Sequence, residues 1–174
     1  HPAPFPHRPA GSRRLELHAL AKGKTVWAVS CEESTHIISE EGKDISYSKR
    51  KTWKTFWLID PLDGTKEFIN KNGEFSVNIA LIDNNVPIMG VVHAPVIQTT
   101  WYGSVYHKSY KINNNRTFNI KVNSPNKEES IKVVSSRSHS NNPKLEDYLN
   151  NFNQYELVKM GSSIKICLVA DGSA

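Results

Sequence analysis

The feature that most constrains the fold is an apolar run that ends at two closely spaced aspartates. Residues 55–60 read Thr-Phe-Trp-Leu-Ile-Asp, and Asp-Pro-Leu-Asp-Gly-Thr occupies residues 60–65. An aromatic and aliphatic run stopped by Asp-Pro predicts a buried strand that ends in a turn. Residues 64–70 then predict a short helix, and Asn72-Gly73 marks its end. The pattern therefore predicts a strand–turn–helix unit with two carboxylates at the turn.

The rest of the chain predicts a β-rich meander followed by helices. Residues 76–82 and 87–94 are two β-rich runs, and the turn-forming Asp-Asn-Asn between them indicates a hairpin. Proline near its first turn favours a helix over 143–152. Further strands are expected at 99–107, 109–112, 117–122 and 131–135, with an Asn-rich turn before the strand at 117–122, and a second helix at 162–170. This pattern is typical of an α/β (α+β) fold with a mainly antiparallel mixed sheet.

Composition allows a packed core and limits the classes of partner. Hydrophobic residues make up 38% of the 174 residues and charged residues 22%, values that suit a folded domain. No apolar run reaches the length of a membrane-spanning helix, about 18 residues. The net charge of +5 suits an anionic partner, but the basic residues are scattered, so we expect no nucleic acid.

The two cysteines and the N-terminal segment carry little functional information. Cys31 and Cys167 predict neither a disulfide framework nor a metal cluster. A cytoplasmic location is expected, with the inner face of the cell membrane as an alternative, and the oligomeric state stays open. Residues 1–36 are Pro-rich, basic and irregular, and they show no secretory signal. We expect them to be a separate segment of no recognisable family, ahead of a domain at 37–174.

The aspartate pair has two possible explanations. Asp60 would be held rigidly at the strand end, and Asp63 would lie at the helix entry, where free N–H groups can face a phosphate. Magnesium prefers such carboxylate oxygens, together with phosphate oxygens and water. The alternative is a helix N-cap, which needs no metal. The complete hexapeptide behind an apolar strand favours the metal site.

This hexapeptide resembles the signature of the inositol monophosphatase superfamily. The longer strings at residues 57–68 and 72–82 resemble its CysQ-like branch, the 3'(2'),5'-bisphosphate nucleotidases of sulfur assimilation. The resemblance implies a layered αβαβα fold and a magnesium-dependent, lithium-sensitive phosphomonoesterase with two or more ions. Its small-molecule substrate would be adenosine 3',5'-bisphosphate, hydrolysed to AMP and phosphate. No Gly-x-Ser-x-Gly elbow or zinc-binding histidine pair is present, which disfavours a serine or zinc hydrolase.

The resemblance also implies a set of metal-binding and catalytic residues. Ser-Glu-Glu at residues 39–41 matches the family, so Glu40 would be a ligand beside the attacking water, although two such glutamates are commonly just solvated charge. The implied metal ligands are Glu40, Asp60, the carbonyl of Leu62, and Asp63. Glu40, Asp60 and Thr65 would be catalytic, with Thr65 orienting the water. Asp63, Gly64 and Thr65 would contact the phosphate.

Two later stretches resemble the nucleotide side of such a site. Residues 133–139 contain Ser-Arg-Ser-His, and residues 161–165 read Gly-Ser-Ser-Ile-Lys. A Gly-Ser turn at a helix start presents N–H donors to an anion, and a lysine adds charge. His139 could also be a plain surface or capping residue, and Arg137 is the weaker candidate. The expected substrate contacts are Ser136, His139, Gly161, Ser162 and Lys165.

The resemblance also indicates missing parts. The family's N-terminal helices with their aspartate, and a Trp-Asp-x-Ala-Ala helix that supplies another ligand, have no match in this sequence. We therefore expect a truncated domain that is inactive or nearly so. The alternatives are a non-catalytic remnant that binds nucleotide or metal weakly, or an inositol or sugar phosphatase of the same superfamily. Lys66-Glu67 and the Ser-His pair at 138–139 favour the nucleotidase.

The assignment of His139 can be tested directly. His139→Ala should weaken binding of the nucleotide bisphosphate more than it slows turnover of a small phosphate ester, because the imidazole is expected to contact only the nucleotide side. Calorimetric binding and phosphate release measure the two quantities. An equal effect on both substrates would contradict the assignment.

Overall fold

The computed structural model describes residues 20–21, 24–25, 36–124, 130–137 and 143–174. The chain divides into two units, residues 1–36 and 37–174. The described part of the first unit contains β1 (Leu20–Ala21) and β2 (Lys24–Thr25), which pair antiparallel. In the described residues, no helix is long and apolar enough to cross a membrane.

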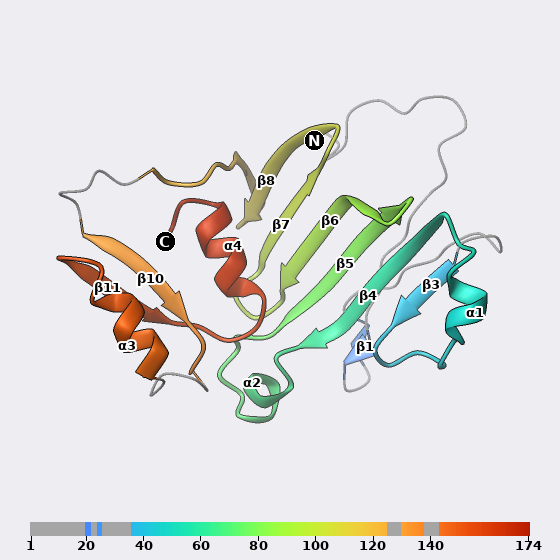
Figure 1. Cartoon of the computed structure of the whole chain (residues 1–174), viewed down its shortest axis with the longest axis horizontal. Helices are drawn as coiled ribbons and strands as arrows, with labels where there is room; N and C mark the ends of the chain where they lie inside the picture. Colours follow the sequence, from blue (N-terminus) through green and yellow to red (C-terminus); the bar gives the residue numbers. More distant parts are fainter. Residues whose placement is uncertain (1–19, 22–23, 26–35, 125–129, 138–142) are drawn as a thin grey trace. The chain divides into compact units, whose positions relative to one another are not determined.

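A seven-stranded sheet dominates the larger unit and has the strands in chain order, from β3 to β9 (Figure 1). Adjacent strands from β4 to β9 all pair antiparallel. The strands are β3 (His36–Ser39), β4 (Thr55–Asp63), β5 (Ser76–Asp83), β6 (Val86–Ala94), β7 (Thr99–Ser104), β8 (His107–Asn113) and β9 (Arg116–Asn119). The fold class predicted from the sequence, mixed α/β with a mainly antiparallel sheet, is confirmed. Short helices α1 (Tyr47–Arg50) and α2 (Thr65–Ile69) flank β4 in the chain.

Three two-residue loops build the meander, and the sequence predicted two of them. Asn84-Asn85 joins β5 to β6, and Asn114-Asn115 joins β8 to β9; all four residues have positive φ. Asparagine tolerates this conformation, which a tight hairpin of the right twist requires. The third loop lies at Val105-Tyr106, so the single strand predicted at 99–107 was wrong. Apolar loop residues give no turn signal.

A second, smaller β–α–β unit follows the sheet. β10 (Ile131–Ser135) and β11 (Tyr155–Lys159) pair in parallel, and α3 (Pro143–Leu149) lies between them in the chain. The sequence predicted β10 and α3 but missed β11, because its Tyr-Glu-Leu-Val-Lys pattern is short and mixed. α4 (Ile164–Ala170) comes next and returns to the large sheet near β6 (Figure 1).

A compact apolar cluster fixes α4 on the sheet. Ile164 and Cys167 of α4 are buried against Ala94 of β6 and Trp101 of β7. Two helix positions three residues apart lie on one face, so α4 presents a single apolar stripe to the sheet. Burial in this cluster raises the pKa of the Cys167 thiol to about 12, which keeps it protonated and unreactive at neutral pH.

Asp171, just beyond α4, holds the helix end on the sheet. Its Oδ2 atom accepts hydrogen bonds from Trp101 Nε1 at 2.8 Å and Lys111 Nζ at 2.6 Å, and its side chain is 1% exposed. Burial alone would raise the pKa of Asp171, but hydrogen bonds from Lys111, Ser173 and Trp101 outweigh it and lower that pKa. The ammonium of Lys111 also lies 5.6 Å from the Trp101 ring centroid.

Asp171→Ala should lower the free energy of unfolding by about 2 kcal/mol, because it leaves a partly buried ammonium and an indole N–H without their acceptor. Chemical denaturation measures this, and Asp147→Ala at an exposed site of α3 is the matched control. Because the pKa of Asp171 is lowered, its contribution should be present above about pH 3.9 and should disappear as the pH falls through the lowered value. Equal losses of unfolding free energy in Asp171→Ala and Asp147→Ala would show that Asp171 does not hold α4 on the sheet.

Candidate active site

A β-bulge at the end of β4 presents the two aspartates. The pairing of β4 with β5 places Asp60 opposite Asn78 and Asp63 opposite Ser76, with a register shift between the two pairs. The N–H of Leu62 donates to Asp60 Oδ1 at 3.1 Å, which closes a local Asx-type turn. Bulges of this kind re-aim side chains next to functional sites. The sheet therefore places both carboxylates at one strand end. The strand was predicted to stop at Asp60, but across the bulge β4 continues to Asp63.

Gly64 ends the strand and begins the helix. It is the N-cap residue of α2 and has a φ of 91°, a left-handed conformation that favours glycine. A Cβ atom there would lie 3.1 Å from Ser162 Cβ, so the position also needs a small residue. Asp63 lies one residue before the cap. The alternative that Asp63 is the N-cap of this helix is therefore wrong.

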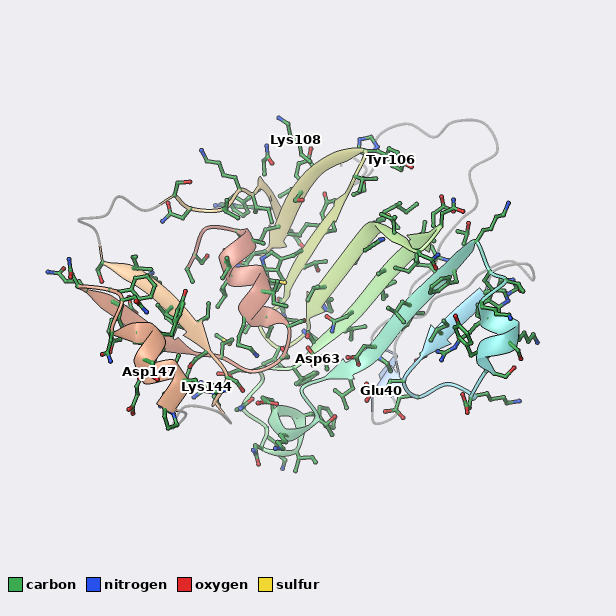
Figure 2. The ribbon with its side chains drawn as sticks, in the orientation of Figure 1. Glu40, Asp63, Tyr106, Lys108, Lys144 and Asp147 are labelled. Atoms are coloured by element: carbon green, nitrogen blue, oxygen red, sulfur yellow. The ribbon has the colours of Figure 1, made fainter. Side chains whose placement is uncertain are left out.

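The carboxylate of Asp63 instead binds the turn before α4, a hundred residues later in the sequence. The backbone N–H of Ser163 donates to Asp63 Oδ2, and the Ser76 hydroxyl lies 3.4 Å from the same oxygen. Ser163 is the N-cap residue of α4, so Asp63 places its negative charge at that helix start. This contact joins the strand–turn–helix unit to the second half of the chain; Figure 2 labels Asp63 at the end of β4.

Hydrogen bonds connect the two aspartates through side chains of β5. The Ser163 hydroxyl donates to Asn78 Oδ1 at 2.8 Å, and the hydroxyls of Ser163 and Ser76 are 2.9 Å apart. The Asn78 side chain also hydrogen-bonds to Asp60. Ser76 is fully buried, so its hydroxyl needs these partners. The result is one network that fixes Asp60 and Asp63 relative to each other.

The turn at residues 161–163 fits tightly against α2 and the loop that follows it. A Cβ atom on Gly161 would lie 2.4 Å from Glu67 Cγ and 2.9 Å from the Glu74 carbonyl oxygen, so no larger residue fits. Ser162 has a φ of 49°, and its carbonyl accepts a hydrogen bond from Lys165 Nζ at 2.6 Å. The predicted Gly-Ser-Ser turn thus lies beside the aspartate turn.

The site concentrates negative charge. Burial raises the pKa of Asp60, and the nearby charges of Asp63 and Glu41 raise it further, against the hydrogen bonds from Leu62 and Asn78. A carboxylate that is crowded by other carboxylates favours a proton or a cation beside it. This donor chemistry, oxygen ligands with excess negative charge, fits a hard divalent cation.

A complete metal-binding group is not preformed. Among the described residues, no three His, Cys, Asp or Glu side chains are arranged to hold a metal ion. Glu40 lies exposed in the turn after β3, the strand that neighbours β4 (Figure 2). Its neighbour Glu41 is the glutamate whose charge acts on Asp60. The predicted convergence of Glu40 with Asp60 and Asp63 as a ligand set is therefore not present here, and the metal ligands stay a prediction.

The predicted substrate contacts lie in different environments. Thr65 is exposed at the first turn of α2, and Lys165 is half-buried on α4. Ser136 is half-buried after β10, whereas His139 lies outside the described residues. Arg137, the weaker candidate, donates through Nε and Nη2 to the carboxylate of Glu74. Its guanidinium is therefore committed to an internal ion pair.

An apolar cavity of about 390 Å³ adjoins the site. Asp60 and Asn78 contribute to its lining, together with Leu58, Trp101 and Ala170. Most of the other lining residues are apolar or small residues of the sheet. The carboxylate of Asp60 thus lies where a polar network meets an apolar surface, which agrees with the raised pKa of Asp60.

Sequence reasoning missed four residues of this arrangement. Ser76 and Asn78 could have been found as polar residues at alternate positions of an apolar strand, because such residues share one face. Ser163 lies in the Gly-Ser-Ser turn, which the sequence had already indicated, but its contact with Asp63 was not predicted. Glu74 gave no local signal, because its partners are 63 and 87 residues away.

Comparison with known proteins shows the family. Residues 10–174 match the inositol monophosphatase family, and the chain belongs to that family. The match begins further toward the N-terminus than the motifs that carried the resemblance. Enzymes of this family are generally Mg²⁺-dependent.

The similar proteins include nucleotidases. A curated relative from Escherichia coli named 3'(2'),5'-bisphosphate nucleotidase CysQ is 44% identical over 138 residues, which cover 79% of this chain and 54% of the relative. The crystal structure of CysQ from Bacteroides thetaiotaomicron, a bacterial member of the inositol monophosphatase family, has a TM-score of 0.73 at 37% identity, covering 82% of this chain and 58% of that one. An IMPase of Thermotoga maritima shares the fold, with a TM-score of 0.65 at 23% identity over 81% of this chain and 52% of its own. The chain spans about half the length of the curated relatives it matches.

Ser163→Ala should lower the free energy of unfolding by about 1–2 kcal/mol, because the Asn78 oxygen and the buried Ser76 hydroxyl each lose a partner. The matched control is Ser124→Ala, an exposed serine whose loss should cost less than about 0.5 kcal/mol. Urea denaturation of both variants provides the comparison. If Ser163→Ala lost no more unfolding free energy than the control, the hydrogen-bond network would contribute little to stability.

Proposed function

We propose that the protein is a 3'(2'),5'-bisphosphate nucleotidase that hydrolyses the 3'-phosphate of adenosine 3',5'-bisphosphate to AMP and phosphate. The observation that carries the proposal is the contact between Asp63 and Ser163. It brings the two family motifs, the aspartate turn and the Gly-Ser-Ser turn, together in one place. Relatives named CysQ, at 36–44% identity over most of this chain, support the substrate class.

The protein's own groups would bind and orient the phosphate ester. Ser163 holds one oxygen of Asp63, which fixes the carboxylate while its other oxygen accepts no hydrogen bond from the described residues. Gly64 and Thr65 begin α2 beside it, so their N–H groups would contact the phosphate. Lys165, close enough to Glu74 to lower its pKa, would add positive charge on the side of the second turn.

Magnesium fits the donor chemistry of this site. Glu40, Asp60, Asp63 and the carbonyl of Leu62 would hold it, with Glu41 adding negative charge near Asp60. When bound, magnesium would supply the positive charge that activates a water and stabilises the leaving oxygen. Thr65, exposed at the helix start, would orient that water. The cytoplasmic location expected from the sequence stays a prediction.

An inositol or sugar phosphatase is the less favoured alternative. The solved IMPase and SuhB structures share 16–23% identity with this chain, a level that shows the fold alone. The nucleotidase-named relatives are about twice as similar. The first prediction of the proposal is therefore a preference for a nucleotide bisphosphate over inositol 1-phosphate.

In an intact version of the enzyme with Mg²⁺ present, calorimetry should show tighter binding of adenosine 3',5'-bisphosphate than of inositol 1-phosphate. Phosphate release should follow the same order and be blocked by millimolar lithium, whereas the present chain is expected to release little or no phosphate. Asp63→Asn should reduce phosphate release by about a hundredfold or more, because it disturbs one positioned catalytic group. Asp147→Asn, on exposed α3, is the matched control. Comparable binding and rates for both substrates would instead assign the protein to the inositol phosphatases.

A further inference from the structure

Glu74 occupies a position that joins three separate segments of the site. It lies in the loop between α2 and β5, and its side chain is 14% exposed. One carboxylate oxygen accepts the Arg137 Nε–H at 2.7 Å and the Gly161 N–H at 2.8 Å, and the other accepts Arg137 Nη2. Both oxygens are therefore used, in the fork geometry that makes arginine–carboxylate pairs strong and directional.

The backbone around Glu74 is built to hold this carboxylate in place. Gly73 has a φ of 80°, and the Glu74 N–H donates to the Asn72 side chain at 3.0 Å. The rings of Phe68 and Phe75 meet edge to face, with centroids 5.0 Å apart. The loop is thus attached to α2 on one side and continues into β5 on the other.

The partners of Glu74 lead to both sides of the candidate site. Gly161 begins the turn whose Ser163 N–H binds Asp63, so it belongs to the phosphate side. Arg137 directly follows the half-buried Ser136, which the sequence analysis expects to contact the nucleotide. The hydrogen bond from Arg137 lowers the pKa of Glu74, so the ion pair stays intact at neutral pH.

We propose that Glu74 is a positioning residue that sets specificity for nucleotide bisphosphates, because it fixes the phosphate-side turn and the nucleotide-side segment at one separation. This inference rests on the proposed function for its substrate. A ligand that spans both sides needs that separation, whereas a small phosphate ester needs only the phosphate side. Loss of Glu74 should therefore discriminate between the two kinds of ligand.

The test uses Glu74→Gln in the full chain, with Glu156→Gln on exposed β11 as the matched control. Without nucleotide, the Gly161 and Ser163 amides should exchange with solvent about tenfold faster in Glu74→Gln, because a charged hydrogen-bond acceptor is lost. With Mg²⁺, the Kd for adenosine 3',5'-bisphosphate should rise about tenfold on the same energetic grounds, and that for inorganic phosphate should change less than about twofold. Wild-type exchange rates in Glu74→Gln would overturn the proposal.

Further outcomes separate the parts of the proposal. Arg137→Lys keeps the charge but loses the fork, so it should shift the same affinities in the same direction by a smaller factor, even if Glu74→Gln folds poorly. If Glu74→Gln weakened nucleotide and phosphate binding equally, Glu74 would have only a structural role, and the proposal that it sets specificity would be wrong. If the wild-type chain binds no nucleotide bisphosphate, the proposed function fails and the specificity fails with it, while amide exchange still decides whether Glu74 holds the turn.

Discussion

The hydrogen bond from the Ser163 backbone to the Asp63 carboxylate is the contact on which the rest of the site depends. A carboxylate at a helix start gains from both the free N–H and the helix dipole. Here the carboxylate comes from a different part of the chain than the helix it serves. Asp63 therefore has two roles, since it caps α4 and forms part of the candidate metal site.

This contact is possible because two glycines allow close approach. Gly64 takes the left-handed conformation that turns β4 into α2, and Gly161 lies directly against the loop after α2. Side chains at either position would push the two turns apart. Glu74 then adds the charged hydrogen bonds that hold the second turn in register. The close approach that the glycines allow and the charged hydrogen bonds of Glu74 therefore both fix the turn that begins at Gly161.

The sequence predicted the local parts of this structure well. The apolar strand that begins at Thr55, the Asn-Asn hairpin turns and the Gly-Ser-Ser turn each carry their signal within a few residues, and the fold class followed from them. The end of that strand was predicted at Asp60, whereas β4 runs on to Asp63. The contacts of Glu74 carry no such signal, because they depend on how distant segments meet. The Val105-Tyr106 loop was missed for a related reason: the register of two strands sets it, and turn-forming residues do not.

The order of the site's parts along the chain has a consequence for how the protein acquires its function. Asp60 and Asp63 belong to a sheet of sequential hairpins, whose contacts are local and form early. Their partner Ser163 is a hundred residues away from Asp63, beyond β10, α3 and β11, and closing that long loop is entropically costly. During synthesis, the sheet can therefore assemble while the two carboxylates still lack their partner. We therefore expect the site to be completed only after α4 has packed on the sheet.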